Sequence, residues 1–191
     1  MTRDHSLIVS IGQFRPEKDH QLQLSSLKRF IDRNGHGKLK LVMIGSCRGQ
    51  EDLDRVEFLR KYAKSNLNLE EGKDFLIKVH APRNEVEELF SHALIGIHTM
   101  WNEHFGIGIV EMMSFGVVVI AHNSGGPKVD IIQPEVSGYL AATEDEYASA
   151  MEAILSRPNL EDIRRFARQH ILKFTEEEFG RNFAEGLQPI L

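Results

Sequence analysis

The sequence predicts an α/β fold built on a doubly wound parallel sheet. Apolar, strand-like runs alternate with helical patterns at a spacing that suits strand–helix–strand units. Runs of Val, Ile and Leu without polar alternation, such as residues 39–44 and 117–120, are typical of strands covered by helices on both faces. With 191 residues and 41% hydrophobic content, residues 1–191 are expected to form one domain with a substantial core.

Six strands are predicted from short apolar runs bounded by turn residues. They are Leu7–Ile11, Leu39–Ile44, Phe75–Val79, Ile95–Thr99, Val117–Ile120 and a short strand at Tyr139–Leu140. Helices are predicted between them at Asp19–Arg33, Glu51–Asn66, Asn84–Ser91, Gly106–Phe115 and Lys128–Ile132. Three further helices are predicted to close the domain, at Glu144–Ser156, Leu160–Lys173 and Glu176–Leu187.

Composition narrows the range of function classes. A net charge of -5 supplies no broad positive field, so binding to nucleic acid or to an anionic membrane would need a local patch. The single Cys47 cannot form an internal disulfide, and no run approaches the roughly 18 apolar residues of a membrane span. We therefore expect a soluble chain in a reducing setting. Met1 leads into the first strand without a visible targeting segment, so we expect a piece of a longer protein.

Unusual residues follow the predicted strands. In an open parallel sheet, ligands bind beyond the carboxyl ends of the strands. Those ends carry Gly12, Gly45, Thr99 and the run 121–126, which contains two glycines. The sequence therefore predicts a ligand site at this edge of the sheet.

The first strand end carries two cations on a turn opened by Gly12. Arg15 offers a planar fork for phosphate oxygens, and Lys18 offers a mobile point charge. Together they would stabilise a diphosphate. The alternative is a solvated loop in which the two cations pair with Glu17 and Asp19. The choice between the two favours diphosphate binding only because the neighbouring strand ends also carry residues suited to a ligand.

Two carboxylates, Glu103 and Glu111, are separated by seven residues that are apolar or glycine except for one histidine. If a helix starts near Gly106, the two carboxylates flank the amide groups of Phe105–Gly108 and do not touch each other. That arrangement suits a nucleotide sugar, with sugar hydroxyls near Glu103, the diphosphate at the amides and ribose hydroxyls at Glu111. A glycosidase acid–base pair is the alternative, but the sequence gives no environment that would raise a carboxyl pKa.

The fifth strand end leads through Ser124, Gly125 and Gly126 to Pro127, a preferred first residue of a helix. We expect the serine to cap that helix. The glycine pair allows a backbone to approach a ligand closely. A plain turn that starts a helix explains the proline well and the glycines less well.

These segments resemble the donor-binding half of the retaining GT-B glycosyltransferases of family GT4. The resemblance rests on residues 12–18, on residues 103–111 with their Phe105-Gly106-Ile107 centre, and on residues 124–126. The amino-acid sequences of residues 10–20, 98–108 and 121–128 are similar to those of a narrower group within that family. This group is the α-1,2-mannosyltransferases that use GDP-mannose to extend dolichol-diphosphate-linked oligosaccharide at the cytosolic face of the endoplasmic reticulum.

The resemblance implies roles for the matching residues. Lys18 would bind the diphosphate, Glu111 the ribose and Glu103 the transferred sugar, with the amides that follow Glu103 beside the sugar and diphosphate. The family usually has arginine where this chain has Gln13, so we expect Arg15 to replace it. His104 stands where the family usually has glycine, and its role stays open.

The resemblance also implies that the chain holds half of an active site. The acceptor-binding domain would be absent, and front-side displacement would use Arg15 and Lys18 to stabilise the leaving diphosphate while Glu103 orients the mannose. No metal and no cofactor are expected besides the donor, and the isolated chain should bind GDP or GDP-mannose weakly and transfer nothing. The parent protein is expected at the endoplasmic reticulum membrane. The basic helix near Arg164 is the candidate for contact with that membrane.

Other interpretations remain open at this stage. A nicotinamide-type oxidoreductase lacks support because residues 12–15 do not have the G-x-G-x-x-G spacing. A domain for another nucleotide sugar, of the UDP-glucose type, and a non-catalytic nucleotide-binding module both fit the pattern. His98, His104 and His122 form no i, i+4 helical pair, so a metal site is not expected. Trp101 is equally suited to stacking on a ligand and to covering an apolar edge.

Overall fold

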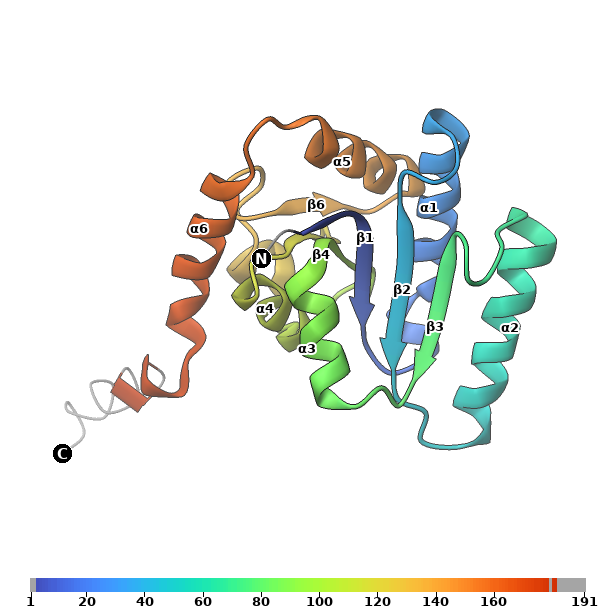
Figure 1. Ribbon diagram of the computed structural model, residues 1–191. Helices are drawn as coiled ribbons and strands as arrows, with labels where there is room; N and C mark the ends of the chain where they lie inside the picture. The colour runs from blue at the N-terminus through green and yellow to red at the C-terminus, as the bar shows by residue number, and fades with distance from the viewer. Residues whose placement is uncertain (1–2, 179, 182–191) are drawn as a thin grey trace.

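A computed structural model describes residues 3–178, 180 and 181 (Figure 1). Its centre is a six-stranded sheet with the order β3-β2-β1-β4-β5-β6, in which every pair of neighbours is parallel. The strands are β1 (Asp4–Ile11), β2 (Lys40–Gly45), β3 (Phe75–Val79), β4 (Ala93–His98), β5 (Val118–His122) and β6 (Tyr139–Ala141). The predicted fold class is therefore confirmed.

Helices cover both faces of the sheet, as Figure 1 shows. The α-helices are α1 (His20–Asn34), α2 (Gln50–Leu67), α3 (Arg83–His92), α4 (Ile107–Ser114), α5 (Glu144–Ser156) and α6 (Glu161–Ile171). Side chains of α1, α2 and α5 share one buried cluster with one face of the sheet, whereas α3, α4 and the second half of α6 pack on the other. Burial on both faces explains why the strands consist of unbroken apolar runs.

The order of the strands reverses between β1 and β4. β1 pairs with β2 on one side, and on the other side Ile8 and Val9 lie opposite Ile95 and Gly96 of β4. The chain runs outward from β1 to β3, then crosses back and runs outward again from β4 to β6. At such a reversal the connections after the two central strands leave in opposite directions and open a crevice at the carboxyl edge.

Several element boundaries differ from the sequence predictions. β1 begins three residues early, at Asp4, because its polar first residues extend beyond the apolar core. A 3₁₀ turn at Pro16–Lys18 precedes α1, and the short helix after β5 is a π-helical turn at Pro127–Ile131. The helix predicted at Leu160–Lys173 ends at Ile171 and continues as a 3₁₀ turn, Leu172–Phe174.

The last predicted helix, Glu176–Leu187, lies largely outside the described residues, although residues 176–178, 180 and 181 are helical. None of the helices in the described part of the chain is long and apolar enough to cross a membrane.

Candidate functional site

The loops after β1 and β4 are joined directly at the carboxyl edge of the sheet. Thr99 follows β4, and its buried hydroxyl donates to the carbonyl oxygen of Lys18 at 2.8 Å. The same hydroxyl accepts a bond of 3.0 Å from the side-chain amide of Gln23 in α1. Because these bonds join segments more than 75 positions apart, they fix the position of Lys18 relative to the end of β4.

Glu103 and Lys18 form an ion pair in this crevice. Lys18 Nζ lies 2.7 Å from Glu103 Oε2, and these side chains are only 24% and 15% exposed. His98, the last residue of β4, places its Nε2 3.4 Å from the same oxygen. The hydrogen bond from His98 and the pairing with Lys18 lower the pKa of Glu103 from 4.5 to about 2, against the opposing effect of burial. Glu103 is therefore an anion at neutral pH.

Backbone geometry holds Lys18 in place. The 3₁₀ turn ends at Asp19, which adopts the left-handed conformation with φ 46°. The Asp19 carboxylate accepts the Leu22 amide at 3.3 Å and so caps α1. The aliphatic part of Lys18 passes close to Gly12, where a Cβ atom would lie 3.7 Å from Lys18 Cδ. Gly12 therefore contributes the surface on which the lysine rests, and Asp19 serves the helix and does not pair with the lysine.

The N-terminus of α4 opens beside the end of β1. Gly106 is its N-cap, with φ 96° and no capping side chain. The helix and the strand are packed closely, since a Cβ atom on Gly108 would lie 2.9 Å from Ile11 Cγ2. Among the described residues the amides of Ile107 and Gly108 have no acceptor. Unpartnered amides at a helix N-terminus bind anions, so the start of α4 is a candidate phosphate-binding point.

Glu111 lies further along α4, where it contacts Arg83 at the start of α3 at 3.0 Å. Its side chain is 31% exposed and that of Arg83 is 63% exposed, so the pair can open to a ligand. The two glutamates make separate pairings and do not bond to each other. Their arrangement matches the expectation that they flank the helix start, and it does not resemble an acid–base pair.

Gly125 and Gly126 bring two loops together. A Cβ atom on Gly125 would overlap the carbonyl oxygen of Glu103, and one on Gly126 would overlap that of His104. The Gly126 amide donates to the Glu103 carbonyl at 2.7 Å. The backbone that approaches these glycines closely is therefore the protein's own. They act on the candidate site by holding the loop that carries Glu103.

Ser124 does not cap the turn that follows, contrary to the sequence prediction. Its hydroxyl accepts the Asn102 amide at 2.7 Å and lies 2.8 Å from His122 Nδ1. The N-cap is Gly126, which has no capping side chain, and Pro127 takes the first helical position as expected. Ser124 thus supports the loop that carries Glu103 from a second direction.

Arg15 and Lys18 point to different places, although the sequence suggested that both cover one site. Arg15 lies 3.8 Å from Glu17 and lines a cavity of about 620 Å³ toward the start of α2. Arg48, in the loop after β2, lines the same cavity. With the Gln13 amide oriented so that its oxygen faces this guanidinium, Arg48 Nε and Nη2 donate to that oxygen at 3.0 and 2.8 Å. No pattern in the sequence connects Arg48 with Gln13.

A second cavity, of about 430 Å³, lies over the carboxyl ends of β1, β2 and β3. Its lining includes Gly12, Gln13, Gly45 and Ser46, with His80 and Ala81 on the far side. A Cβ atom on Gly45 would overlap the carbonyl oxygen of Gly12, so the two loops depend on this glycine to close together. The cavity adjoins the Gln13 side of the crevice and is large enough to admit a nucleobase.

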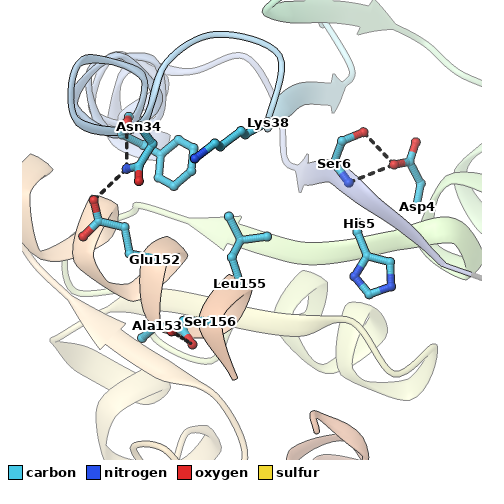
Figure 2. A pocket seen from close by; sticks show the side chains of 10 residues that line it. Asp4, His5, Ser6, Asn34, Lys38, Glu152, Ala153, Leu155 and Ser156 are labelled. Atoms are coloured by element: carbon cyan, nitrogen blue, oxygen red, sulfur yellow. Dashed lines mark hydrogen bonds between the residues drawn. The ribbon is translucent and has the colours of Figure 1, made fainter. Parts of the chain in front are cut away.

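A cavity of about 790 Å³ lies at the opposite, amino edge of the sheet (Figure 2). It is bounded by the start of β1 and by the ends of α1 and α5. Figure 2 shows that its polar groups bond one another: Asp4 accepts from Ser6, and Asn34 donates to Glu152 at 2.7 Å. No helix begins there with unpartnered amides, so the phosphate chemistry described above belongs to the other edge.

His98, which the sequence raised as a metal ligand that was not expected, contacts the candidate site. It is 6% exposed, contacts Glu103, and its backbone carbonyl accepts from the buried Tyr147 hydroxyl at 2.8 Å. Its place as the last residue of a strand before an acidic loop was the available signal. Trp101, by contrast, is 71% exposed. Within the described ranges, no three His, Cys, Asp or Glu side chains are grouped to hold a metal ion.

The family model described as "Glycosyl transferases group 1" matches residues 2–170. The chain belongs to this family. The matched region includes the whole sheet and each of the candidate residues at its carboxyl edge. The resemblance found in the sequence is thereby confirmed at the level of the family.

Curated relatives of this glycosyltransferase chain carry the name "GDP-Man:Man(3)GlcNAc(2)-PP-Dol alpha-1,2-mannosyltransferase". The protein from Xenopus laevis is 46% identical over 98% of this chain, and the Mus musculus protein is 45% identical over 97%. The Homo sapiens protein is 41% identical over the full chain. In each case the chain spans 39% of the relative's own length.

Solved structures share the fold at lower sequence identity. An α,α-trehalose-phosphate synthase from Burkholderia xenovorans, in complex with glucose-6-phosphate, superposes with a TM-score of 0.79 at 16% identity, over 96% of this chain and 44% of that one. The C-terminal domain of a glycosyl transferase group 1 protein, LpcC from Francisella tularensis, gives a TM-score of 0.72 at 21% identity. That match covers 90% of this chain and 87% of the other.

Proposed function

We propose that this chain is the donor-binding portion of a retaining α-1,2-mannosyltransferase. In this proposal it binds GDP-mannose, and mannose is transferred to a dolichol-diphosphate-linked oligosaccharide during assembly of the N-glycan precursor. Residues 1–191 would form a single nucleotide-sugar-binding domain, and the acceptor site would be supplied by a further domain of a longer protein. The length of the relatives, of which the chain spans 39%, is consistent with that division.

The observation that carries the donor role is the unpartnered N-terminus of α4 at the reversal of the sheet, with Glu103 on one side and Glu111 on the other. A diphosphate at the amides of Ile107 and Gly108 would leave the sugar toward Glu103. The ribose would lie toward Glu111, whose carboxylate can accept two bonds from a vicinal diol. The cavity over β2 and β3 is then in place for the base.

The identity of the donor and acceptor comes from the relatives. Three proteins with 41–46% identity to this chain are named for GDP-mannose as donor and for an oligosaccharide on PP-Dol as acceptor. We extend this substrate class to the present chain because its loops carry the charged residues that such a donor requires. Location of the parent protein at the cytosolic face of the endoplasmic reticulum membrane belongs to the same proposal.

Catalysis in this proposal is electrostatic and uses side chains in place of a resident metal. As the bond between mannose and diphosphate breaks, Lys18 would stabilise the negative charge that develops on the leaving group, and Arg15 would turn from its place beside Glu17 to join it. Lys18 must then exchange part of its contact with Glu103, now 2.7 Å, for phosphate oxygens. Glu103 stays in place through His98 and orients the sugar hydroxyls. The reaction is completed by groups that the acceptor domain brings.

A nucleotide panel tests this function. Calorimetric titration of the chain with GDP, GDP-mannose, UDP-glucose and NAD should show binding of the two guanine nucleotides and weaker or no binding of the others. NAD preference would point to an oxidoreductase, and UDP-glucose preference to another nucleotide-sugar donor. Absence of all binding would leave a non-catalytic scaffold. Mannose transfer to an oligosaccharide lipid by the isolated chain would contradict the division into donor and acceptor domains.

Glu111→Ala separates the ribose role from the phosphate site. The substitution should weaken GDP binding about tenfold, the value of one charge-assisted hydrogen-bond pair, and change inorganic diphosphate binding less than about twofold. Both affinities are measured by calorimetry. Glu87→Ala is the matched control, because it removes the other carboxylate that contacts Arg83. Equal losses for GDP and diphosphate would argue against a ribose contact.

A further inference from the structure

The positive charges at the carboxyl edge differ in how far they are already neutralised. Lys18 is bonded to a carboxylate at 2.7 Å and is only 24% exposed. Arg83 contacts two carboxylates, those of Glu87 and Glu111. These two cations have little charge left for a ligand unless their ion pairs open, so a diphosphate needs a further source of positive charge.

Arg48 differs from Lys18 and Arg83. Its guanidinium contacts no carboxylate in the described part of the chain, and its side-chain partner is the neutral amide of Gln13. The backbone amide of Arg48 donates to Asp52 at 2.8 Å, which fixes the loop at the start of α2. The side chain is therefore oriented by two bonds to Gln13 while its charge remains uncompensated.

The position of Gln13 places this charge beside the anion site. Gln13 follows Gly12 at the end of β1, and β1 ends against the first turn of α4 at Ile11. Gln13 lines the 430 Å³ cavity over β1–β3, and Arg48 lines the 620 Å³ cavity next to it. The guanidinium, through its contact with Gln13, therefore connects the linings of the two cavities.

We propose that Arg48, oriented by Gln13, is the arginine that binds the diphosphate of the donor. The inference rests on the proposed donor function and adds a residue to it. The two N–H groups that now donate to Gln13 can turn to two phosphate oxygens, because a guanidinium fork matches phosphate geometry. Gln13 acts as a positioning residue, and its amide keeps the arginine extended over the crevice before the ligand arrives.

Calorimetry with inorganic diphosphate and with GDP tests the inference on the whole chain. Arg48→Gln should weaken both ligands about tenfold or more, as expected for the loss of a charged, bidentate contact. Arg48→Lys keeps the charge without the fork and should give an intermediate loss. Arg165→Gln, which removes an exposed arginine of α6, is the matched control and should leave both affinities within about twofold.

A double variant adds a test that a purely structural role would not pass. An arginine at position 13 would place its guanidinium near the present position of the Arg48 fork, so Gln13→Arg in the Arg48→Gln background should recover most of the lost diphosphate affinity. Thermal unfolding of each variant confirms that the fold is kept. Full affinity in Arg48→Gln, or a loss confined to Arg15→Gln, would overturn the inference.

The two ligands also separate this inference from the proposed function. If diphosphate binds in an Arg48-dependent way while GDP shows no advantage over other nucleotides, the arginine site stands and the mannosyltransferase assignment fails. If GDP and GDP-mannose bind selectively and Arg48→Gln has no effect, the assignment stands and the inference fails. A wild-type chain that binds neither ligand contradicts both.

Discussion

The two edges of the sheet differ in the chemistry that they present. The amino edge has the larger cavity, about 790 Å³, but its polar groups bond one another as Asp4 does with Ser6 (Figure 2). The carboxyl edge has smaller cavities, yet it holds the unpartnered start of α4, the uncompensated Arg48 and a carboxylate, Glu103, with a pKa of about 2. Cavity size alone would favour the amino edge, whereas the unpartnered amides and the charged groups favour the carboxyl edge.

The difference teaches that this binding site depends on close backbone packing. At the carboxyl edge, Gly45 and Gly126 let neighbouring loops approach to distances that no Cβ atom would permit. The cavity at the amino edge is lined in part by exposed side chains such as Lys38. Substitutions of these close-packed glycines should therefore cost stability, whereas substitutions of exposed residues in the lining at the amino edge should cost little.

The largest effect is expected for Gly126→Ala. The new methyl group would overlap the carbonyl oxygen of His104, which is backbone and cannot turn aside. We expect the free energy of unfolding to fall by about 3 kcal/mol, the upper range for overpacking, as measured by urea denaturation. Binding of GDP-mannose should fall as well, because the displaced loop carries Glu103.

Two controls bracket that result. Gly49→Ala, at a glycine with open space around it, should cost less than about 1 kcal/mol. Lys38→Ala, in the lining of the cavity at the amino edge, should change stability by less than about 0.5 kcal/mol. If Lys38→Ala proved as costly as Gly126→Ala, the contrast between the two edges would be wrong.

A pH effect of intermediate size is expected from His20, at the start of α1. Burial, followed by the nearby charges of Arg55 and Lys18, lowers its pKa from 6.5 to about 3. As the pH falls below 6.5 the unfolded chain takes up the proton first, so stability decreases until the pH reaches about 3. Between pH 6.5 and 5 the loss should be about 1.5 kcal/mol.

Denaturation at several pH values measures this slope. His20→Gln should remove most of it in that window. His5→Gln, which removes an imidazole from the lining at the amino edge, should keep it. A wild-type chain whose stability is flat from pH 6.5 to 5 would show that His20 is not held neutral by the fold.

The smallest expected effect comes from Glu103→Gln. Loss of the carboxylate should weaken GDP-mannose binding five- to tenfold, about 1 to 1.4 kcal/mol, because a charged acceptor for the sugar hydroxyls is gone. GDP, which has no sugar at this position, should bind as well as before or slightly better, since Lys18 loses its counter-ion. Calorimetry compares the two ligands, and equal losses would remove Glu103 from the sugar site.

Much of the fold could be predicted because each buried strand is a short, continuous run of apolar residues in the sequence. Residues 41–44 are fully apolar because β2 is covered on both faces, and such a run is visible without any partner. The position of the site followed from the same logic, since parallel strands bring their carboxyl ends to one edge. The polar start of β1 was missed because it adds no apolar residues to the run.

The pairings within the site could not be predicted, because they depend on loop conformation. Lys18 meets Glu103 across 85 positions, and the left-handed Asp19 decides the direction in which the chain presents it. Arg48 reaches Gln13 from a different loop. The glycines at 125 and 126 looked suited to a ligand, whereas they meet the protein's own backbone. The catalytic and binding roles assigned to Lys18, Glu103 and the other candidates remain predictions.

Amide chemical-shift mapping of the labelled chain with GDP-mannose tests the central claim most directly. The account predicts that the largest shifts occur at Gly12, Gln13, Ile107 and Gly108, around the crevice between β1 and α4. Residues of the cavity at the amino edge, such as Lys38 and Leu155, should stay unchanged. Shifts centred on that cavity, with none at the start of α4, would contradict the account.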